Sequence, residues 1–111
     1  MTVIYEDFKK IKIHIGTIIS VTNNEKAKKP ALVLKINFGK KINIKTTSAQ
    51  ITDYYNKTSL IGKQVIAVCN FASKNIAGII SEVLILGAVE KNGTVVLLHP
   101  SQPVENGLEI F

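Results

Sequence analysis

Hydrophobic residues recur at every second position along three stretches in the first half of the chain, 11–21, 31–38 and 41–45. A period of two is typical of strands with one buried face, so each stretch is predicted to be a β-strand. In the first stretch, the positions predicted to face inward are Ile11, Ile13, Ile15, Ile19 and Val21. Gly16 interrupts this stretch, as glycine does where a strand bends sharply around a small barrel. In the third stretch, both isoleucines are expected to point inward.

The second half of the chain carries two apolar runs without alternation, at 65–71 and 81–89. Continuous apolar runs of this length are typical of strands that are buried on both sides. The segment 72–78 between them is expected to be a loop. Asn92-Gly93 predicts a hairpin turn into a last strand at 94–99.

A short helix is predicted between the third and fourth strands. Thr47 and Gln50 have the spacing of a capping box, and Ile51, Tyr54 and Tyr55 follow at helical spacing. On such a helix, one tyrosine is expected to lie in the core and the other to cover it. The alternative is that the tyrosines stack on nucleobases, but an aromatic content of 6% without tryptophan argues against a stacking platform.

The two ends of the chain are apolar and differ in pattern. In 1–11, Ile4 and Phe8 lie one helical turn apart with Thr2 as the expected N-cap. This segment is predicted to be a short helix, or an arm that packs on the barrel or on a second copy of the chain. The segment 100–111 contains two prolines and is predicted to be an extended strap.

The predicted order of elements is that of an OB-fold, an all-β, five-stranded Greek-key barrel with short helices. A glycine-bent first strand and a helix between the third and fourth strands are the features that favour it. The pattern alone leaves other small β-barrels open. A chain of 111 residues has the length of one domain, so 1–111 is expected to fold as a single unit.

Charge is distributed unevenly along the chain, whose net charge is +6. Between Phe8 and Ser81 there are 13 lysines and two acids, whereas the rest of the chain has one lysine and six acids. A polarised charge of this kind predicts a basic face that attracts polyanions, although lysines also serve simply to solvate a surface. There is no arginine, and lysine acts as a point charge, which favours contacts to phosphates over contacts to base edges.

Several classes of protein are not expected from this sequence. No apolar run approaches the about 20 residues that a membrane-spanning helix needs, and two acids interrupt the N-terminus where an export signal would be apolar. The single cysteine, Cys69, has no partner for a disulfide within the chain, so the cytoplasm is the expected compartment. His14 and His99 lack the further ligands of a metal site, and Ser48 lacks the surroundings of a nucleophile. No enzyme activity, metal or cofactor is therefore expected.

Five segments carry more specific residues: DFKKIKIHIGTI, KKPALVLKINFGKKINIKTTSAQIT, LIGKQVIAVCNF, IAGIISEVLILG and VVLLHPSQPVENG. In this order they resemble the tRNA-binding domain family, a set of OB-folds found alone and attached to aminoacyl-tRNA synthetases. Within this family the chain most resembles the stand-alone bacterial CsaA-type proteins, which are described as tRNA-binding proteins and as export-related chaperones. The resemblance implies a homodimer without metal or cofactor that grips tRNA by its overall shape.

The resemblance and the charge pattern together give a predicted RNA-binding site. The family motifs contribute Ser48, Gln50, Asn70, Lys74, Ser81 and Glu82, which are expected to cluster at one end of the barrel. The charge pattern adds Lys12, Lys35, Lys40, Lys41 and Lys45, of which the last four belong to the hairpin of the second and third strands. Relatives usually carry arginine where this chain has His14 and Lys74, and the loss of forked donors is expected to weaken bidentate contacts.

The apolar ends give a second prediction. Ile4, Tyr5, Phe8, Leu108, Ile110 and Phe111 are expected to form either the dimer interface or a groove for peptides. The expected partners are thus tRNA, a second copy of the chain and, in the chaperone alternative, unfolded or preprotein polypeptides. No insertion into a membrane is expected.

Overall fold

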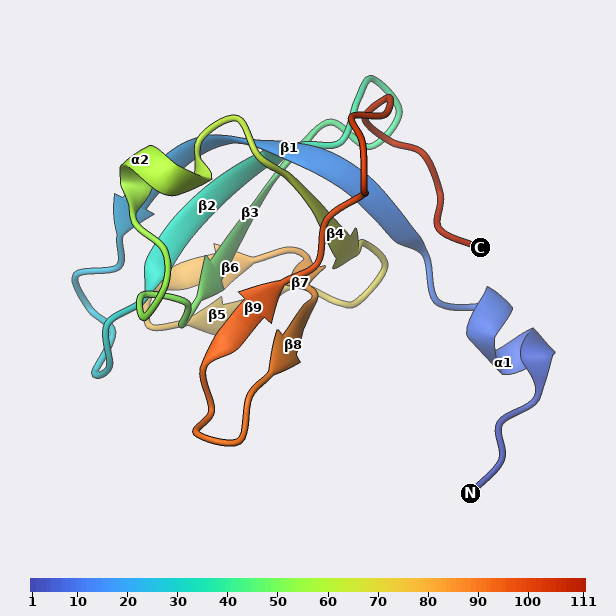
Figure 1. Ribbon diagram of the computed structural model, residues 1–111, viewed down its shortest axis with the longest axis horizontal. Coiled ribbons are helices and arrows are strands. Elements are labelled where there is room, and N and C mark those ends of the chain that lie inside the picture. Colours follow the sequence, from blue (N-terminus) through green and yellow to red (C-terminus); the bar gives the residue numbers. More distant parts are fainter.

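The computed structural model describes all 111 residues, and Figure 1 shows a curved sheet that wraps into a barrel. The elements are α1 (Tyr5–Lys9), β1 (Ile13–Asn23), β2 (Leu32–Asn37), β3 (Ile44–Ala49), α2 (Lys57–Leu60), β4 (Gln64–Val68), β5 (Lys74–Ile76), β6 (Ile79–Ser81), β7 (Leu84–Ile85), β8 (Gly87–Val89) and β9 (Val95–Leu97). The main sheet has the order β3-β2-β1-β4-β7, and β5–β6 and β8–β9 form two separate hairpins. This nearly closed, five-stranded antiparallel barrel with two short helices confirms the predicted OB-fold class.

The first strand contains a bulge that the alternating pattern hides. The register between β1 and β2 shifts between Ile18 and Ser20, so one extra residue is inserted there. An insertion of one residue exchanges the inward and outward faces of a strand. Ile18 before the bulge and Val21 after it are both buried, whereas Ile19, which has no partner on β2 and was predicted to face inward, is 43% exposed.

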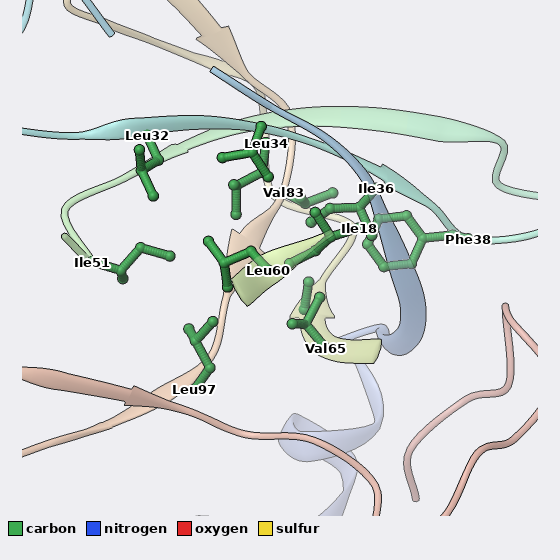
Figure 2. Packing of buried hydrophobic residues seen from close by; sticks show 12 residues of the cluster. Ile18, Leu32, Leu34, Ile36, Phe38, Ile51, Leu60, Val65, Val83 and Leu97 are labelled. Atoms are coloured by element: carbon green, nitrogen blue, oxygen red, sulfur yellow. The ribbon is translucent and has the colours of Figure 1, made fainter. Parts of the chain in front are cut away.

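The barrel is filled by one cluster of apolar side chains (Figure 2). Leu34, Ile36 and Phe38 alternate along β2 and its end, and all three are fully buried. Burial of each such side chain contributes about 1.5–3 kcal/mol relative to its exposed state. A Cβ atom on Gly16 would lie 2.6 Å from Cγ2 of Ile36 and 2.7 Å from Cδ1 of Phe38, so only glycine lets β1 approach this core so closely.

The predicted helix exists, but at a different place. Thr47 lies inside β3 and is buried, so it caps no helix. The capping box is formed instead by Asn56 and Ser59, whose side chains each accept a hydrogen bond from the backbone N–H of the other at the start of α2. Of the two tyrosines, Tyr55 packs against the core and Tyr54 is exposed, as expected.

Two predictions for the second half of the chain are wrong. The segment expected to be a loop, 72–78, contains β5 and the turn of the hairpin β5–β6, where Ala77 and Gly78 have positive φ angles of 48° and 84°. The expected buried strand at 81–89 is broken into β7 and β8, and Leu84 and Val89 are 50% and 70% exposed. A short apolar run alone does not distinguish a buried strand from a succession of short edge strands.

The turn before β3 changes which isoleucine of the third stretch faces inward. Asn43 has a φ of 69° in this turn, and Ile44, which was expected to be inside, is exposed while Ile42 packs on the core. The hairpin turn at Asn92-Gly93 is confirmed, with Gly93 at a φ of 90° between β8 and β9.

The two ends of the chain behave differently. Figure 1 shows α1 standing off the barrel, no residue of α1 is buried, and the residue that precedes the helix is Ile4 rather than the expected Thr2 cap. The C-terminal segment instead follows β1: the Ile15 N–H donates to the Leu108 carbonyl at 3.1 Å, and the Ile110 N–H donates to the Ile13 carbonyl at 2.8 Å. The predicted strap is therefore hydrogen-bonded along the barrel. Neither helix of the structure is long and apolar enough to cross a membrane.

Candidate functional site

The barrel closes between β3 and the chain from the last residue of β6 onward, without a regular ladder of backbone hydrogen bonds. Hydroxyl groups lie between the two backbones instead. The Thr47 hydroxyl donates to the Val83 carbonyl at 2.9 Å and lies 2.8 Å from the Ser81 hydroxyl, and the Ser48 N–H donates to Ser81 Oγ at 3.3 Å. We call this contact between Thr46–Ser48 and Ser81–Val83 the seam.

A single acid completes the seam. The Glu82 N–H donates to the Thr46 carbonyl at 2.8 Å, and the Thr46 N–H donates to Glu82 Oε1 at 3.0 Å. The other carboxylate oxygen lies 3.8 Å from Lys45 Nζ, with about a third of each side chain exposed. An ion pair this exposed contributes little to stability, so the main role of Glu82 here is to hold the backbone of β3.

Beside the seam lies a cavity of about 660 Å³, here called the seam groove. Its polar lining residues are Thr47, Ser48, Gln50, Lys74, Ser81 and Glu82, and its apolar ones include Ile51, Phe71, Ile76, Val83, Leu84, Ile85 and Val95. Cavities of this size with an apolar floor and a few polar groups are the usual form of ligand sites. The groove lies beside the contact where hydroxyl side chains and a single backbone hydrogen bond join the two segments.

The loop between β1 and β2 forms a second cavity of about 320 Å³, here called the loop hollow, which contains Lys28 and Lys29. The loop hollow and the seam groove share Ser48, Gln50 and Ile76, so they adjoin. In OB-folds, the loops between the first two and the last two strands flank the nucleic-acid-binding face.

Asn24 fixes this loop in place. It is only 8% exposed, and its amide nitrogen donates to Ser48 Oγ at 3.2 Å and to the Ile76 carbonyl at 3.4 Å. Its carbonyl oxygen accepts from the Lys26 N–H at 3.2 Å. One buried side chain thus ties the β1–β2 loop to both β3 and β5, and it sets where Lys28 and Lys29 lie relative to the groove.

The structure brings together about half of the residues predicted for RNA binding. Ser48, Gln50, Lys74, Ser81 and Glu82 all line the seam groove, and Lys45 adjoins them through Glu82. These residues come from segments up to 37 positions apart in the sequence, and it is the closure of the barrel at the seam that makes them neighbours.

The other predicted residues lie elsewhere. Lys40 and Lys41 are in the turn that precedes β3, whereas Gln50 follows it, so the length of the strand separates them. Lys35 is exposed on β2, opposite Thr46. Lys12 pairs with Glu109 of the strap, with 3.6 Å between Nζ and Oε2. Lys40 and Lys41 therefore form a basic area separate from the groove, whereas Lys45 of the same hairpin adjoins the groove.

Asn70 has a structural role. Its side-chain amide donates to the Lys10 carbonyl at 2.7 Å and accepts from the Lys12 N–H at 2.9 Å. Asn70 thereby holds the segment between α1 and β1 against the end of β4, so its amide is engaged with backbone groups.

Four residues of the site were not predicted from the sequence: Asn24, Lys28, Lys29 and Phe71. The lysines form a run in the loop between the first two strands, which a closer use of the OB-fold prediction could have identified. Phe71 ends the apolar run 65–71 that was predicted to be buried on both sides, but β4 stops at Val68 and Phe71 is 55% exposed beside the groove. Asn24 looks like an ordinary turn residue until its burial is known.

Two further features limit the chemistry that the chain can perform. Burial raises the pKa of the Cys69 thiol to about 11, and Lys45 and a hydrogen bond to the His14 backbone offset only part of this effect. The Cys69 thiol is therefore protonated at neutral pH and is a poor nucleophile. No group of three or more His, Cys, Asp or Glu side chains is arranged to hold a metal ion.

Known proteins share the fold and much of the sequence of this chain. A family model described as "Putative tRNA binding domain" matches residues 13–109. The chain belongs to this tRNA-binding domain family. The match extends from β1 to the strap, so it includes the seam, both cavities and the β1–β2 loop.

Individual members of the family are similar over the whole chain. The CsaA chaperone of Bacillus anthracis is 43% identical, with a TM-score of 0.95 and complete coverage of both chains. The CsaA chaperone protein of Picrophilus torridus is 49% identical, with a TM-score of 0.92 over 99% of this chain and all of the other. This tRNA-binding domain is therefore of the CsaA type.

The family also includes parts of larger enzymes. The methionine–tRNA ligase of Bacteroides fragilis is 33% identical over 106 residues, which are 96% of this chain but 15% of the ligase. The tRNA-binding domain described here thus corresponds to a small portion of such ligases.

Proposed function

We propose that this chain is a non-catalytic, cytoplasmic tRNA-binding protein that grips the phosphate backbone of tRNA over the seam groove and the loop hollow. The observation that carries the proposal is the position of Lys28, Lys29 and Lys74. They surround adjoining cavities, and none of them forms a salt bridge within the chain. Three lysines without acidic partners supply the charge that phosphates neutralise, with release of counterions.

The composition of the surface favours recognition of shape. Lysine and hydroxyl groups predominate, and no arginine is present to make paired hydrogen bonds to a base edge. Ser48 and Gln50 lie between the lysines and can reach phosphate oxygens or ribose 2′-hydroxyls. Asn24 fixes the distance between the lysines of the β1–β2 loop and the seam groove. A fixed distance between cationic groups would favour a folded RNA over an extended strand.

The proposed active form is a homodimer built on the apolar ends. Ile4 and Tyr5 are 62% and 65% exposed, and α1 covers no part of its own barrel. Exposed apolar side chains on an arm are stabilised when a second copy covers them. The ion pair of Lys12 with Glu109 places the strap, with Phe111, near the root of the arm, so both ends would join one interface.

A peptide-binding chaperone is the second candidate, because the seam groove has an apolar floor and because two similar structures are of CsaA chaperones. In this alternative an unfolded or preprotein polypeptide would occupy the groove. The lysines around the groove would then have no defined partner, and for this reason we favour tRNA.

A salt-titrated gel shift tests the proposal with tRNA, an unstructured RNA of equal length and an unfolded protein. We expect tRNA to bind most tightly, with a log–log salt slope of about −0.7 to −0.9 per neutralised phosphate. The double variant Lys28→Ala/Lys29→Ala should reduce the magnitude of that slope by about 1.5, since two contacts are lost. The matched control, Lys40→Ala/Lys41→Ala, removes the same charge away from the groove and should change the slope less. Equal affinity for both RNAs would contradict the proposal.

A further inference from the structure

The seam groove contains more apolar surface than the binding of phosphates uses. Leu84 and Ile76 on its walls are 50% and 37% exposed, above a floor in which Ile51 and Val83 are almost fully buried. A phosphate backbone gripped by lysines would leave this surface in contact with water. An apolar cavity next to a basic surface fits a ligand that is apolar at one end and anionic at the other.

Phe71 is the one aromatic side chain that lines the groove, and 55% of it is exposed. Phe71 lies just beyond the end of β4. It lines the same cavity as two polar side chains, Ser48 of β3 and Gln50, which follows β3. Proteins that bind single-stranded nucleic acids stack bases on exposed aromatic side chains that lie in positively charged grooves.

We propose that the seam groove receives the base of one unpaired nucleotide of the tRNA, stacked on Phe71, while Lys74 and the lysines of the loop hollow hold its flanking phosphates. This inference rests on the proposed function and adds a subsite to it. The base enters beside Leu84, and its edge faces the hydroxyl of Ser48 and the amide of Gln50, which are donors and acceptors suited to a base edge.

Charge decides between a nucleotide and an apolar peptide. The single acid of the groove, Glu82, is already engaged by the Thr46 N–H and by Lys45. Lys28, Lys29 and Lys74 therefore leave the two cavities with an excess of positive charge. An apolar peptide would cover the floor alone, whereas a nucleotide covers the floor with its base and neutralises the rim with its phosphates.

The first test measures the tRNA affinity of Phe71→Leu, which keeps an apolar side chain but removes the ring. We expect binding about tenfold weaker with an unchanged salt slope, because stacking involves no counterion release. Ile61→Ala is the matched control, since Ile61 is 54% exposed and lies outside both cavities, and it should leave the affinity unchanged. Unfolding midpoints of both variants show that each is folded.

The second test follows the methyl NMR signals of Ile51, Val83 and Ile85 during titration with the four ribonucleoside 5′-monophosphates, with inorganic phosphate and with a short apolar peptide. Shifts with a nucleotide but not with phosphate support the base subsite. Shifts with the peptide alone would overturn it and assign the groove to polypeptides. If Phe71→Leu binds tRNA as the unsubstituted chain does, the subsite is wrong while the proposed function stands. If the unsubstituted chain does not bind tRNA, the proposed function itself fails.

Discussion

The two sides of the barrel are held together in different ways. On one side, here called the ladder side, β1 pairs with both β2 and β4, and β2 pairs with β3, through continuous backbone registers that a single bulge interrupts. On the seam side, β3 meets the end of β6 and the residues that follow it through the Thr47 and Ser81 hydroxyls and through Glu82. The ladder side is regular and filled with apolar side chains. The seam side is irregular and carries the seam groove and the loop hollow.

This difference separates the parts of the fold that provide stability from the part that is open to a ligand. A backbone ladder leaves no room between strands that lie about 4.8 Å apart. At the seam, one backbone hydrogen bond and the side chains of Thr47, Ser81 and Glu82 take the place of a ladder, and the seam groove lies beside them. A barrel that closed with a complete ladder would be more regular and would have no such cavity.

The largest effect is expected on the ladder side. Leu34→Ala removes a fully buried side chain of β2 and should lower the free energy of unfolding by about 3 kcal/mol, since it leaves a cavity among residues that cannot collapse freely. Urea denaturation measures this loss. Lys35→Ala, the exposed neighbour, is the control and should change stability by less than about 0.5 kcal/mol. Equal losses in the two variants would show that the ladder side does not carry the stability of the barrel.

The ladder side was also the part that could be predicted from the sequence. Alternation placed Leu34 and Ile36 inside, and glycine placed the bend at Gly16, because regular pairing preserves the period of two. The failures occurred where the backbone departs from that period. The bulge turned Ile19 outward, and the left-handed Asn43 did the same to the residue that follows it.

The seam side was hard to predict because its contacts lie far apart in the sequence and involve side chains. The hydrogen bond that joins Thr47 to Ser81 spans 34 residues, and in the sequence Thr47 has the spacing of a helix cap. For the candidate site, the family motifs identified Ser48, Gln50 and Lys74. The charge pattern alone could not separate the lysines beside the groove from Lys40 and Lys41 in the β2–β3 turn. These two groups lie near opposite ends of β3, and only the structure shows which end carries the groove.

A smaller effect is expected at the seam. Thr47→Val keeps the volume of the side chain but removes its hydrogen bonds to the Ser81 hydroxyl and the Val83 carbonyl. Loss of stability should be about 1.5 kcal/mol, because a buried carbonyl and a buried hydroxyl each lose a partner. Denaturation of Thr22→Val, an exposed site on β1, supplies the control for the substitution itself.

A double-mutant cycle sharpens this prediction. Ser81→Ala should cost less in the Thr47→Val background than in the unsubstituted chain, since the two hydroxyls lie 2.8 Å apart and stabilise the same contact. Strict additivity of the two losses would mean that the hydroxyls act independently. The seam would then be closed mainly by Glu82.

The smallest effect concerns Cys69, next to the end of β4, the strand that pairs with both β1 and β7. Burial raises the pKa of its thiol from 9.0 to about 11. A raised thiol pKa favours the folded state below pH 9, and this contribution is lost as the pH rises from 9 towards 11, where an unfolded chain would already be ionised.

At pH 8 the thiolate fraction of Cys69, and with it the rate of alkylation by iodoacetamide, should be on the order of 100-fold below that of an exposed cysteine. Lys45→Ala removes a charge that lowers this pKa, so alkylation should become slower still, whereas Lys63→Ala should have no such effect. An alkylation rate that rises with a midpoint near pH 9 would show that the Cys69 thiol is open to water. The end of β4 would then belong to the open part of the barrel and not to the ladder side.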